Sequence, residues 1–312
     1  MAKVFIDGSA GTTGLRIYER LAQRGDIELM TLPEETRKDP KARQKALNEA
    51  DIAFLCLPDA AAIEAVELVE NERTVIIDTS TAHRVLPEWT YGMPELDGQR
   101  EKIAHSRRIA NPGCHASGFI ALVAPLVQAG ILPPDENISC FSLTGYSGGG
   151  KKMIADYQSS DRSYLLGAPR MYALGQQHKH LKEMAKLCGL LNPPAFCPIV
   201  DDFYSGMEVT IPLFASALRA GMQEICETYR QYYTGQIIHF DEAADEAGFL
   251  SATAFSGRDD MQISVHGNAE RILLTARFDN LGKGASGAAV QNMNIVLGLD
   301  EKTGLDLGGI KE

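Results

Sequence analysis

The sequence predicts two domains, a doubly wound α/β domain at the N-terminus and an α+β domain after it. A short apolar strand runs directly into a glycine-rich turn and then a helix, over residues 3–24. Strands and helices go on alternating up to residue 78, whereas beyond residue 194 most strand-like runs follow one another directly. Alternation is typical of a parallel sheet, and consecutive strands favour an antiparallel one. A chain of 312 residues is also long enough for two hydrophobic cores.

The composition is that of an ordinary globular protein, with 45% hydrophobic and 23% charged residues. The net charge of −11 argues against general binding to nucleic acid or to anionic lipid. The 6 cysteines form no CxxC pair and no metal-ligand spacing, so neither a disulfide framework nor a metal site is expected. A reducing cytoplasm fits this cysteine usage. No stretch approaches the length of a membrane-spanning or secretory segment, so we expect neither.

The first strand, residues 3–7, is followed by three glycines spaced G-x-x-G-x-x-G, which are Gly8, Gly11 and Gly14, and by a helical run over 15–24. Glycines let a backbone approach a pyrophosphate closely, and a helix N-terminus supplies N–H donors and positive potential. The order strand, glycine turn, helix therefore predicts a dinucleotide site. A plain flexible turn is the alternative.

The second strand is predicted over 27–32, and the segment after it carries mixed charges from Glu34 to Lys38. A carboxylate at this place selects NAD through the ribose 2′-hydroxyl, whereas a basic residue accommodates the 2′-phosphate of NADP. Arg37 or Lys38 favours NADP. A solvated loop explains the same charges equally well.

Helices are predicted over 40–48 and 61–69, and strands over 51–57 and 74–78. The apolar run 51–57 is typical of a parallel strand covered on both faces. Ligands of such sheets lie beyond the carboxyl ends of the strands, which is where Pro58 and Ser80 fall. The following segment, 82–108, is expected to be irregular. In it, Arg84 is a candidate anion ligand, with a surface salt bridge as the alternative.

Cys114 lies between a strand predicted over 107–110 and an amphipathic helical run over 119–128. A thiol on such a strand-to-helix turn has backbone N–H groups and a helix N-terminus nearby, and both favour the thiolate. This position predicts a nucleophile. The alternative is a small buried apolar residue.

A strand predicted over 137–144 ends in the glycine-rich loop 145–152, which closes with Lys151 and Lys152. Such a loop can hold a phosphoryl group or position a substrate, although it lacks the spacing of a P-loop. A mobile surface loop is the alternative.

The most regular helix is predicted over 176–188. On that helix His178 and His180 would lie about 200° apart, so only one of them would face a given site. Glu183 could orient His180 from one turn away. Two histidines at i and i+2 do not have the helical spacing of metal ligands.

Five further strands are predicted over 194–200, 206–215, 235–240, 261–266 and 270–278, with a helix over 222–233. They predict an antiparallel sheet, whose flat face would suit dimerisation. The segment 279–287 is rich in small residues and leads into a helix over 288–297. Small residues at this place allow close approach of a ligand or simple close packing.

In their order and spacing these segments resemble the N-acetyl-γ-glutamyl-phosphate reductases of arginine biosynthesis, in their shorter variant. The resemblance rests on the segments 8–14, 78–84, 91–95, 111–114, 145–148, 178–183 and 282–287. Two departures stand out. His115 replaces the aromatic residue usual in the longer variant, and His83-Arg84 replaces its Asp-Phe-Arg, which puts the substrate-anion contacts in doubt although Arg84 is kept.

The resemblance implies an NADP-linked fold like that of aspartate-semialdehyde and glyceraldehyde-phosphate dehydrogenases, in which the C-terminal helix packs back on the nucleotide domain. It implies a Rossmann-like dinucleotide-binding domain over 1–113, completed by a C-terminal helix within 284–312. A catalytic and dimerisation domain with an antiparallel sheet would span 114–283. A homodimer or homotetramer in the cytoplasm is expected, acting on a small acyl phosphate, with no metal.

The resemblance also implies a mechanism that suits the chemistry. Cys114 would attack the acyl phosphate and expel phosphate, NADPH would reduce the thioester, and His178 or His180 would shuttle the proton. The residues expected to bind NADP are Gly8, Ser9, Ala10, Gly11, Thr12, Thr13, Gly14, Arg37, Pro58, Ser80, Gly148, Asn280 and Lys283. The residues expected to bind the substrate are Arg84, Asn111, Lys151, Lys152 and Glu183.

Three other functions remain open from the sequence. A related semialdehyde dehydrogenase would act on aspartate or on carrier-bound glutamate or aminoadipate. A non-catalytic NADP-binding sensor would keep the cofactor site without needing Cys114. A cysteine hydrolase would leave the glycine loop 8–14 unexplained.

Overall fold

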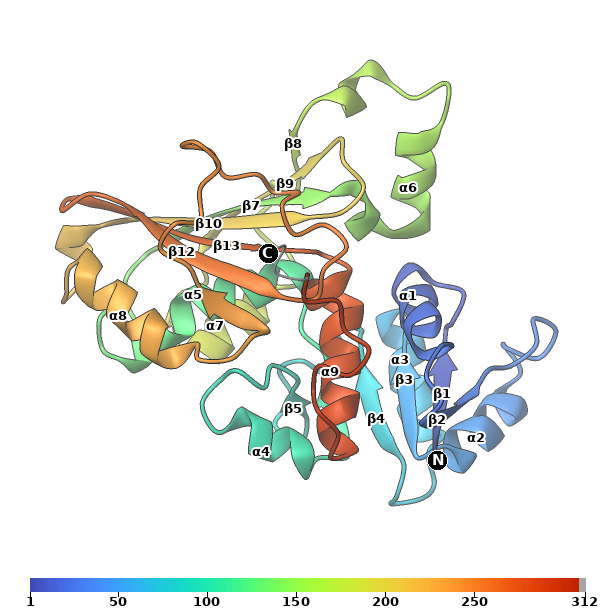
Figure 1. Ribbon diagram of the computed structural model, residues 1–312. Coiled ribbons are helices and arrows are strands. Elements are labelled where there is room, and N and C mark those ends of the chain that lie inside the picture. Colours follow the sequence, from blue (N-terminus) through green and yellow to red (C-terminus); the bar gives the residue numbers. More distant parts are fainter. Residues whose placement is uncertain (309–312) are drawn as a thin grey trace. The chain divides into compact units, whose positions relative to one another are not determined.

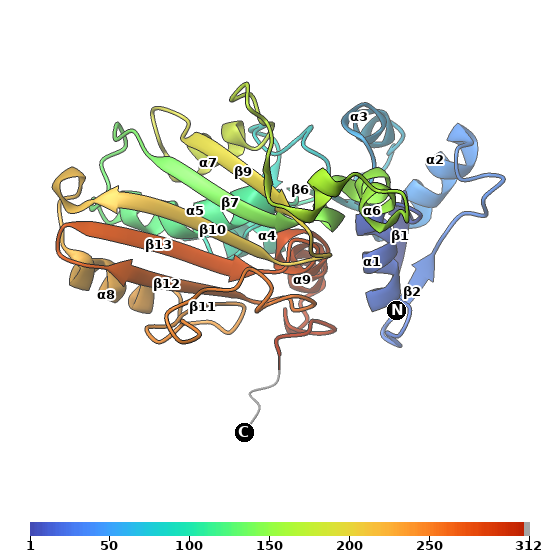
Figure 2. The same ribbon diagram turned by 90° about the horizontal axis from the view of Figure 1, so that it is seen from above.

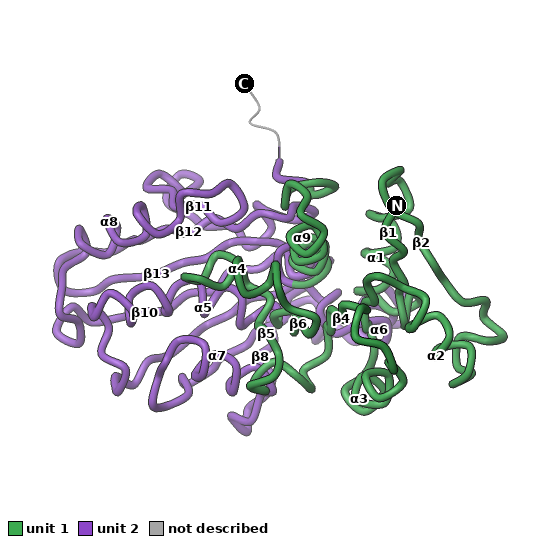
Figure 3. Tube along the Cα trace, turned by 90° about the horizontal axis from the view of Figure 1, so that it is seen from below, with its two compact units in different colours: residues 1–113, 285–305 green, residues 114–284, 306–312 purple. Residues whose placement is uncertain are grey.

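The computed structural model describes residues 1–308. The chain divides into two compact units, coloured separately in Figure 3. Unit 1 comprises Met1–Gly113 and Ala285–Leu305, and unit 2 comprises Cys114–Gly284 together with the segment that starts at Asp306. Two stretches far apart in the sequence therefore build unit 1.

Unit 1 contains a six-stranded sheet and five α-helices (Figure 1). Its strands are β1 (Ala2–Asp7), β2 (Ile27–Met30), β3 (Ile52–Leu55), β4 (Val75–Asp78), β5 (Thr90–Tyr91) and β6 (Arg108–Ala110). Its helices are α1 (Thr12–Leu21), α2 (Pro40–Glu49), α3 (Asp59–Glu67), α4 (Gln99–Ala104) and α9 (Gly287–Val296).

The sheet of unit 1 has the order β2-β1-β3-β4-β6-β5, and every pairing in it is parallel. Its two faces carry separate apolar cores. On one face Ile17, Ile103 and Val290 bring α1, α4 and α9 together, and on the other Leu47 and Ala62 bring α2 and α3. Helices on both faces of a parallel sheet make this the predicted doubly wound fold.

The C-terminal helix α9 is fixed within unit 1 by polar contacts as well as by its apolar face. The Asn292 side chain donates to Gly92 O at 2.9 Å, and Arg24 donates to Asn294 Oδ1 at 2.7 Å. Asn111 donates to Ala285 O at 3.0 Å, just before the helix begins. The observed helix covers only part of the predicted segment 284–312, of which residues 309–312 lie outside the described residues.

The segment predicted to be irregular, 82–108, is more regular than expected. It contains β5, which pairs with β6, and the six-residue helix α4. The ring of His83 stacks on that of Trp89 with the centroids 4.1 Å apart. Strand β5 has only two residues and α4 less than two turns, too few for a period in sequence hydrophobicity to be visible.

Unit 2 contains a seven-stranded sheet with helices on one side of it. Its strands are β7 (Ser139–Gly145), β8 (Arg170–Met171), β9 (Ala195–Asp201), β10 (Met207–Phe214), β11 (Ile238–Phe240), β12 (Met261–Gly267) and β13 (Arg271–Phe278). Its α-helices are α5 (Cys114–Gln128), α6 (Gly150–Gln158), α7 (Leu181–Cys188) and α8 (Met222–Tyr232). Its shorter helical turns are η1 (Tyr146–Gly149), η2 (Tyr164–Gly167) and η3 (Ala215–Ala217), and η4 (Gly282–Ser286) begins in unit 2 and ends in unit 1.

The sheet of unit 2 has the order β11-β12-β13-β10-β7-β9-β8. Most pairings are antiparallel, as predicted, but β7 pairs with β9 and β11 pairs with β12 in parallel. A parallel pair needs a crossover connection, and the long segment with α6 and α7 provides one between β7 and β9. Helices α5, α7 and α8 lie on the same side of this sheet (Figures 1 and 2).

Helix α5 packs closely on the sheet because of Gly118. A Cβ at this position would come within 2.7 Å of the side chains of Phe278 and Val209. The helix also contains Pro125, which cannot donate to the carbonyl of Ala121 four residues earlier. The hydroxyl of Tyr233, just beyond α8, donates to that carbonyl at 2.7 Å. A neighbouring element thus satisfies the backbone group that the proline leaves without its helical donor.

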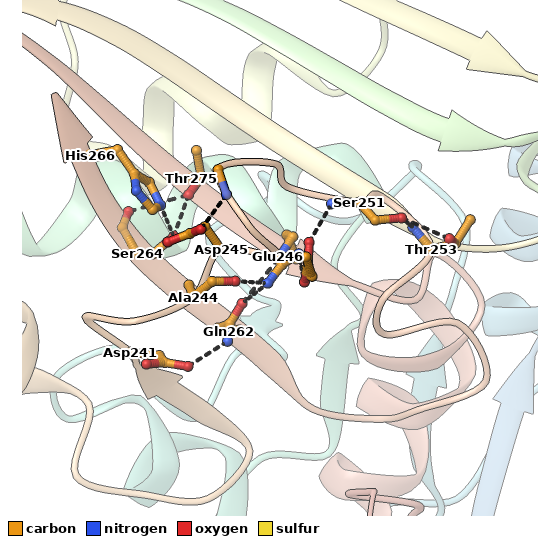
Figure 4. Close-up of polar contacts among 12 residues, drawn as sticks. Asp241, Ala244, Asp245, Glu246, Ser251, Thr253, Gln262, Ser264, His266 and Thr275 are labelled. Carbon is orange, nitrogen blue, oxygen red and sulfur yellow. Dashed lines mark hydrogen bonds and ion pairs between the residues drawn. The ribbon is translucent and has the colours of Figure 1, made fainter.

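A polar network surrounds the buried Arg277 of β13. Figure 4 labels three of its members, Ala244, Glu246 and Gln262. The Arg277 guanidinium donates to the side-chain oxygen of Gln262 at 2.7 Å and to Glu246 Oε1 at 2.6 Å, and also to the carbonyl of Ala244. Glu246 accepts in turn from the backbone N–H of Ser251 at 3.0 Å. These contacts hold the loop between β11 and β12 against the strands.

Candidate active site

The glycine loop of unit 1 has a shape that only glycine permits at two of its positions. Gly8 has φ +87°, and a Cβ there would lie 2.3 Å from the carbonyl oxygen of Cys56. A Cβ at Gly14 would lie 2.3 Å from the carbonyl oxygen of Gly8. The turn is closed by a hydrogen bond of 2.9 Å from Gly11 N to Gly8 O. The predicted strand, glycine turn and helix are therefore present, with α1 starting at Thr12 rather than at residue 15.

No side-chain cap is bonded to the N-terminus of α1 or of α3. The capping positions are Gly11 and Pro58, neither of which has a polar side chain. Backbone N–H groups at such a helix start, together with the helix dipole, favour an anionic ligand. The loop 8–14 thus fits the pyrophosphate of a dinucleotide.

The carboxyl end of β4 carries a compact polar cluster around Asp78. This buried carboxylate accepts from Ser80 Oγ and lies 2.6 Å from His83 Nδ1. Thr81, which follows Ser80 in the sequence, donates through its backbone N–H and its hydroxyl to Asp59 at the start of α3. These bonds tie the ends of β3 and β4 together and bury Ser80 at that edge.

The basic residue predicted to select NADP, Arg37, lies on the surface and pairs with Glu34 at 2.8 Å. A second arginine, Arg43 of α2, is nearly buried and bonds Asp7, the residue that precedes the glycine loop. Burial raises the pKa of Asp7, while Arg43 partly offsets that rise. The sequence did not indicate a role for Arg43, because Arg43 lies on α2 whereas its partner Asp7 lies at the end of β1.

Arg84 and Asn111 are both buried in unit 1, and a hydrogen bond joins the Arg84 side chain to the backbone of Asn111. Arg84 Nε donates to the carbonyl of Asn111 at 2.9 Å, and its guanidinium also donates to Thr79 O at 3.0 Å. The predicted alternative of a surface salt bridge is therefore wrong for Arg84. Its interactions with backbone carbonyls fix the loop that leads into Cys114.

Cys114 is the first residue of α5 and is half-buried. Its Cβ lies close to Gly284, where an added Cβ would come within 2.9 Å. The helix is longer than the predicted amphipathic run and is buried along most of its length. A sulfur at a helix N-terminus is the position in which a thiolate is stabilised.

Four of the other cysteines have a raised pKa. Burial raises the pKa of Cys56 to about 12, and it also raises the pKa of Cys140 and Cys188. The pKa of Cys226 is raised by burial as well. These thiols stay protonated near neutral pH and are poor nucleophiles.

The two histidines predicted on a helix lie before it, because α7 starts at Leu181. The prediction that they point to opposite sides is therefore wrong. The rings of His178 and His180 are 4.6 Å apart and perpendicular, and both contact the ring of His115. The backbone N–H of His180 donates to His178 Nδ1 at 3.2 Å, which leaves Nε2 as the nitrogen of a neutral His178 that carries the proton.

The histidine segment is held in place by Gln176, whose backbone has φ +54°. Its amide oxygen accepts from Phe196 N at 2.8 Å and its amide nitrogen donates to Phe196 O at 2.7 Å. The Gln176 side chain is thus bonded to the backbone N–H and C=O groups of Phe196 that a neighbouring strand would otherwise pair with. Glu183, which is buried, has its carboxylate 3.9 Å from His180 Nε2.

Three residues of this region carry no strong sequence signal. His115 Nδ1 lies 2.7 Å from Ser142 Oγ, and His115 Nε2 lies 2.6 Å from the hydroxyl of Tyr172. They come from α5, β7 and the segment after β8, so no local spacing connects them. Only the unusual histidine after Cys114 pointed toward this cluster.

The predicted glycine loop 145–152 forms the turn η1 and the first turn of α6. Lys151 and Lys152 are exposed there, and Gly148 is exposed in the turn. Asn280 is buried and links two segments, accepting from Gly206 N and donating to Ser147 Oγ, both at 2.9 Å. Lys283 is also buried, within η4.

Within residues 1–308 no group of three or more histidine, cysteine, aspartate or glutamate side chains is arranged to hold a metal ion. Over the same residues no helix has the length and apolar character needed to cross a membrane.

Solved structures with the same architecture are aspartate semialdehyde dehydrogenases. Aspartate semialdehyde dehydrogenase II from Vibrio cholerae, solved in complex with ASA, has a TM-score of 0.72 at 17% identity, covering 95% of this chain and 98% of that one. The enzyme from Candida albicans, solved with NADP, has a TM-score of 0.67 at 15% identity, covering 95% and 98%. These similarities establish the fold, and the predicted fold class is confirmed.

Sequence relatives are much closer. N-acetyl-γ-glutamyl-phosphate reductase 2 from Nostoc sp. is 48% identical over 97% of this chain and 99% of its own. The reductases from Burkholderia lata and Rhizobium meliloti are 46% and 47% identical, over 95% of this chain and 96% and 98% of theirs. Residues 3–106 match the NAD binding domain and residues 114–280 the dimerisation domain of semialdehyde dehydrogenases. The chain belongs to the N-acetyl-γ-glutamyl-phosphate reductases, within the semialdehyde dehydrogenase family.

Proposed function

We propose that this protein reduces N-acetyl-γ-glutamyl phosphate to N-acetylglutamate 5-semialdehyde with NADPH and releases phosphate, as a step of arginine biosynthesis. The observation that carries the proposal is the position of Cys114, the first residue of α5, in a chain that matches reductases of this name over nearly its whole length. A thiol at a helix start suits a covalent acyl carrier.

The reaction follows from the thiol. The Cys114 thiolate attacks the acyl carbon, a C–S bond forms, and the C–O bond to phosphate breaks, so that phosphate leaves with its electron pair. Bound NADPH would supply the hydride for reduction of this thioester. A proton lent to the carbonyl-derived oxygen by a nearby acid returns to that group as the C=O bond re-forms and the C–S bond breaks, which releases the aldehyde and the Cys114 thiolate. Backbone N–H groups in the first turn of α5 are the candidates for stabilising the oxyanion.

We assign the proton transfer to His178, assisted by its neighbour His180. His178 is half-exposed, whereas His180 is buried beside Glu183. The hydrogen bond to its Nδ1 directs the Nε2 proton of His178 away from the backbone. Glu183 then acts by holding His180, so its role in substrate binding is indirect.

The residues proposed to hold NADP lie in both units. In unit 1 the loop 8–14, Pro58 and Ser80 would contact the cofactor, and Arg37 would contact the 2′-phosphate once it exchanges its partner Glu34. In unit 2 the proposed residues are Gly148, Asn280 and Lys283. The absence of side-chain caps at α1 and α3 supports the first group.

We propose that the substrate is bound by Arg84, Lys151 and Lys152, which are the ligands of its anionic groups, and by Asn111. Arg84 is buried and donates to two carbonyls, which would hold its guanidinium in place for an anion. Lys151 and Lys152 are exposed, which suits the binding of the phosphate that the reaction must release. A net charge of −11 makes such local basic groups necessary for an anionic substrate.

For the assembly we propose a homodimer or homotetramer formed through unit 2, which matches a dimerisation domain. A cytoplasmic location is proposed because none of the 6 cysteines, all of which lie within the described residues, forms a disulfide.

Phosphate-dependent reduction of NADP, measured separately with N-acetylglutamate semialdehyde and with aspartate semialdehyde, tests the proposal. We expect turnover with the first substrate, loss of turnover in Cys114→Ala, and NADP affinity unchanged in that variant. An acyl group trapped on Cys114 should be released as aldehyde on addition of NADPH. A preference for aspartate semialdehyde, or full activity of Cys114→Ala, would contradict the proposal.

A further inference from the structure

The segment directly after strand β13, residues 279–284 (the Asp279 turn), is organised by the side chain of its first residue. All six residues belong to unit 2, and Asp279 is fully buried. Asp279 Oδ1 accepts from the backbone N–H of Leu281 at 2.6 Å and from that of Gly282 at 2.9 Å. One carboxylate oxygen thus holds two consecutive N–H groups of the turn.

The Asp279 turn is wider than an α-helical turn. Gly284 N donates to Asp279 O at 3.0 Å, five residues back, which is the spacing of a π-helical turn. Such turns are rare and are frequent at functional sites. Asp279 therefore holds both parts of the turn, the first through its side chain and the last through its backbone.

The loop before β12 supports the Asp279 turn. Gly257 N donates to the second carboxylate oxygen of Asp279 at 2.6 Å. A Cβ at Gly282 would lie 1.9 Å from the carbonyl oxygen of Arg258, so the two backbones are already in close contact. The turn cannot move toward this loop without displacing it.

Gly284, at the end of the turn, contacts the residue proposed as the nucleophile. A Cβ at Gly284 would lie 2.9 Å from Cβ of Cys114, the atom that carries the sulfur, and 3.3 Å from Cε2 of Phe278. The other side of the same ring, Cε1, would lie 2.7 Å from a Cβ at Gly118, four residues after Cys114 in α5. Two glycines thus let one ring and the turn pack against the start of α5.

We propose that Asp279 is a positioning residue for Cys114. By bonding the Asp279 turn it keeps Gly284 against the Cys114 side chain, and this contact fixes the direction of the sulfur at the start of α5. A nucleophile held in one direction reacts faster with an acyl carbon that is also held in place. The inference rests on the proposed function in one respect, that Cys114 is the nucleophile.

The first test is the rate at which iodoacetamide alkylates Cys114 in Gly284→Ala, followed by mass spectrometry of the peptide that contains it. The rate is compared on the upper plateau of its pH profile, where the thiol is ionised, so that it reports access to the sulfur. We expect alkylation at least about fivefold slower, because the added methyl group must be accommodated beside Cys114 Cβ. General loosening of the fold would speed alkylation instead. An unchanged or faster rate would overturn the proposal.

A double-mutant cycle tests whether Asp279 is the cause. In Asp279→Ala the turn loses its three bonds to the carboxylate and can move away from the added methyl group. In that background Gly284→Ala should slow alkylation less than about twofold. Asp279→Asn keeps an acceptor oxygen for Leu281 N and Gly282 N, so the full slowing should return. Equal slowing with aspartate and with alanine at position 279 would overturn the role of Asp279.

Gly267→Ala is the matched control. A Cβ there would lie 2.1 Å from the carbonyl oxygen of Arg271, a comparable clash within unit 2 but at the opposite end of β13 from Asp279. Alkylation of Cys114 in this variant should match that of the unaltered protein, and a slowing equal to that of Gly284→Ala would overturn the proposal. Cys226 of α8, which is also half-buried, gives a reference rate in each sample.

Turnover provides a separate readout. Asp279→Ala should lower kcat about 10- to 100-fold, and Asp279→Asn should restore most of it. A kcat of Asp279→Ala equal to that of the unaltered protein would overturn the positioning role. The alkylation measurements use neither the acyl phosphate nor NADPH, so a protein that shows the expected coupling but does not turn over the semialdehyde would refute the proposed function alone.

Discussion

Gly8 shows how a single residue shapes the cofactor loop. An alanine at this position would combine φ +87° with a Cβ placed 2.3 Å from the carbonyl oxygen of Cys56. The loop must therefore shift away from β3. We expect Gly8→Ala to weaken NADP binding at least about tenfold, because the backbone N–H groups no longer converge on one point. Fluorescence titration with NADPH measures the affinity.

The control for this prediction is Gly25→Ala. Nothing lies within 4 Å of a Cβ built at Gly25, and this glycine does not have a positive φ. Equal affinities of the two variants for NADPH would show that the loop 8–14 does not contact the cofactor.

The lowered pKa of His115 predicts how the free energy of unfolding depends on pH. That pKa is about 3 in the folded protein, against about 6.5 for an unperturbed histidine. Between these values the unfolded chain binds the extra proton, so this residue lowers stability as the pH falls below 6.5. From pH 7 to pH 5 the loss attributable to His115 is about 2 kcal/mol.

Urea denaturation at several pH values measures this effect. The free energy of unfolding of His115→Phe should fall less steeply below pH 6.5 than that of the unaltered protein. The absolute stability of the variant does not matter for this comparison, because only the slope is used. Parallel slopes would mean that His115 is charged in the folded protein.

Some residues of the candidate site could be predicted from the sequence, and others could not. Cys114 was predicted because its signal is local, a thiol between a strand and a helix. Tyr172 and Ser142 were missed, because they meet His115 only through the pairing of β7, β8 and β9. No spacing in the sequence encodes that meeting.

At the scale of elements, α5 depends on α8. Pro125 removes the helical donor to Ala121 O, and the Tyr233 hydroxyl replaces it. We expect Tyr233→Phe to lower the free energy of unfolding by about 1–2 kcal/mol, since a buried carbonyl is left without this donor. Chemical denaturation measures the change.

A double-mutant cycle with Pro125→Ala isolates the cause. Alanine restores the backbone N–H, which can then donate to Ala121 O, so Tyr233→Phe should cost less in that background by about 1 kcal/mol. If Tyr233→Phe has the same effect with and without the proline, the hydroxyl does not compensate for the missing helical bond.

The segment that carries His178 and His180 is a second such element. Its helix was predicted to start at residue 176, but the Gln176 side chain pairs with Phe196 and α7 begins at Leu181. Hydrophobic periodicity identifies the buried stripe of α7 but not a side chain that replaces a strand partner. That is why the relative orientation of the two histidines was predicted wrongly.

Gln176→Ala should therefore impair catalysis more than folding. With the histidines displaced by a fraction of an ångström or more, kcat should fall about 10- to 100-fold. Gln177→Ala, at an exposed neighbouring position, is the control. A kcat of Gln176→Ala equal to that of the control would exclude a positioning role.

At the scale of the whole molecule, the chain builds unit 1 from both of its ends. The strands up to residue 110 could be predicted from their apolar runs, but the role of α9 could not. An apolar helix near the C-terminus fits any core, and only the fold shows that Val290 and Met293 complete the face formed by α1 and α4. The resemblance to reductases suggested this packing, and periodicity did not.

Met293→Ala tests whether α9 is part of the unit that binds the cofactor. Met293 is fully buried, so its truncation should lower stability by about 2–5 kcal/mol. Saturating NADP stabilises, by mass action, each part of the protein that binds it. In thermal denaturation with and without NADP, the transition lowered by Met293→Ala should be one that NADP raises. Leu299→Ala, at a position 38% exposed, should change neither. If Met293→Ala lowers a transition that NADP leaves unmoved, α9 stabilises a part of the molecule other than the nucleotide-binding unit.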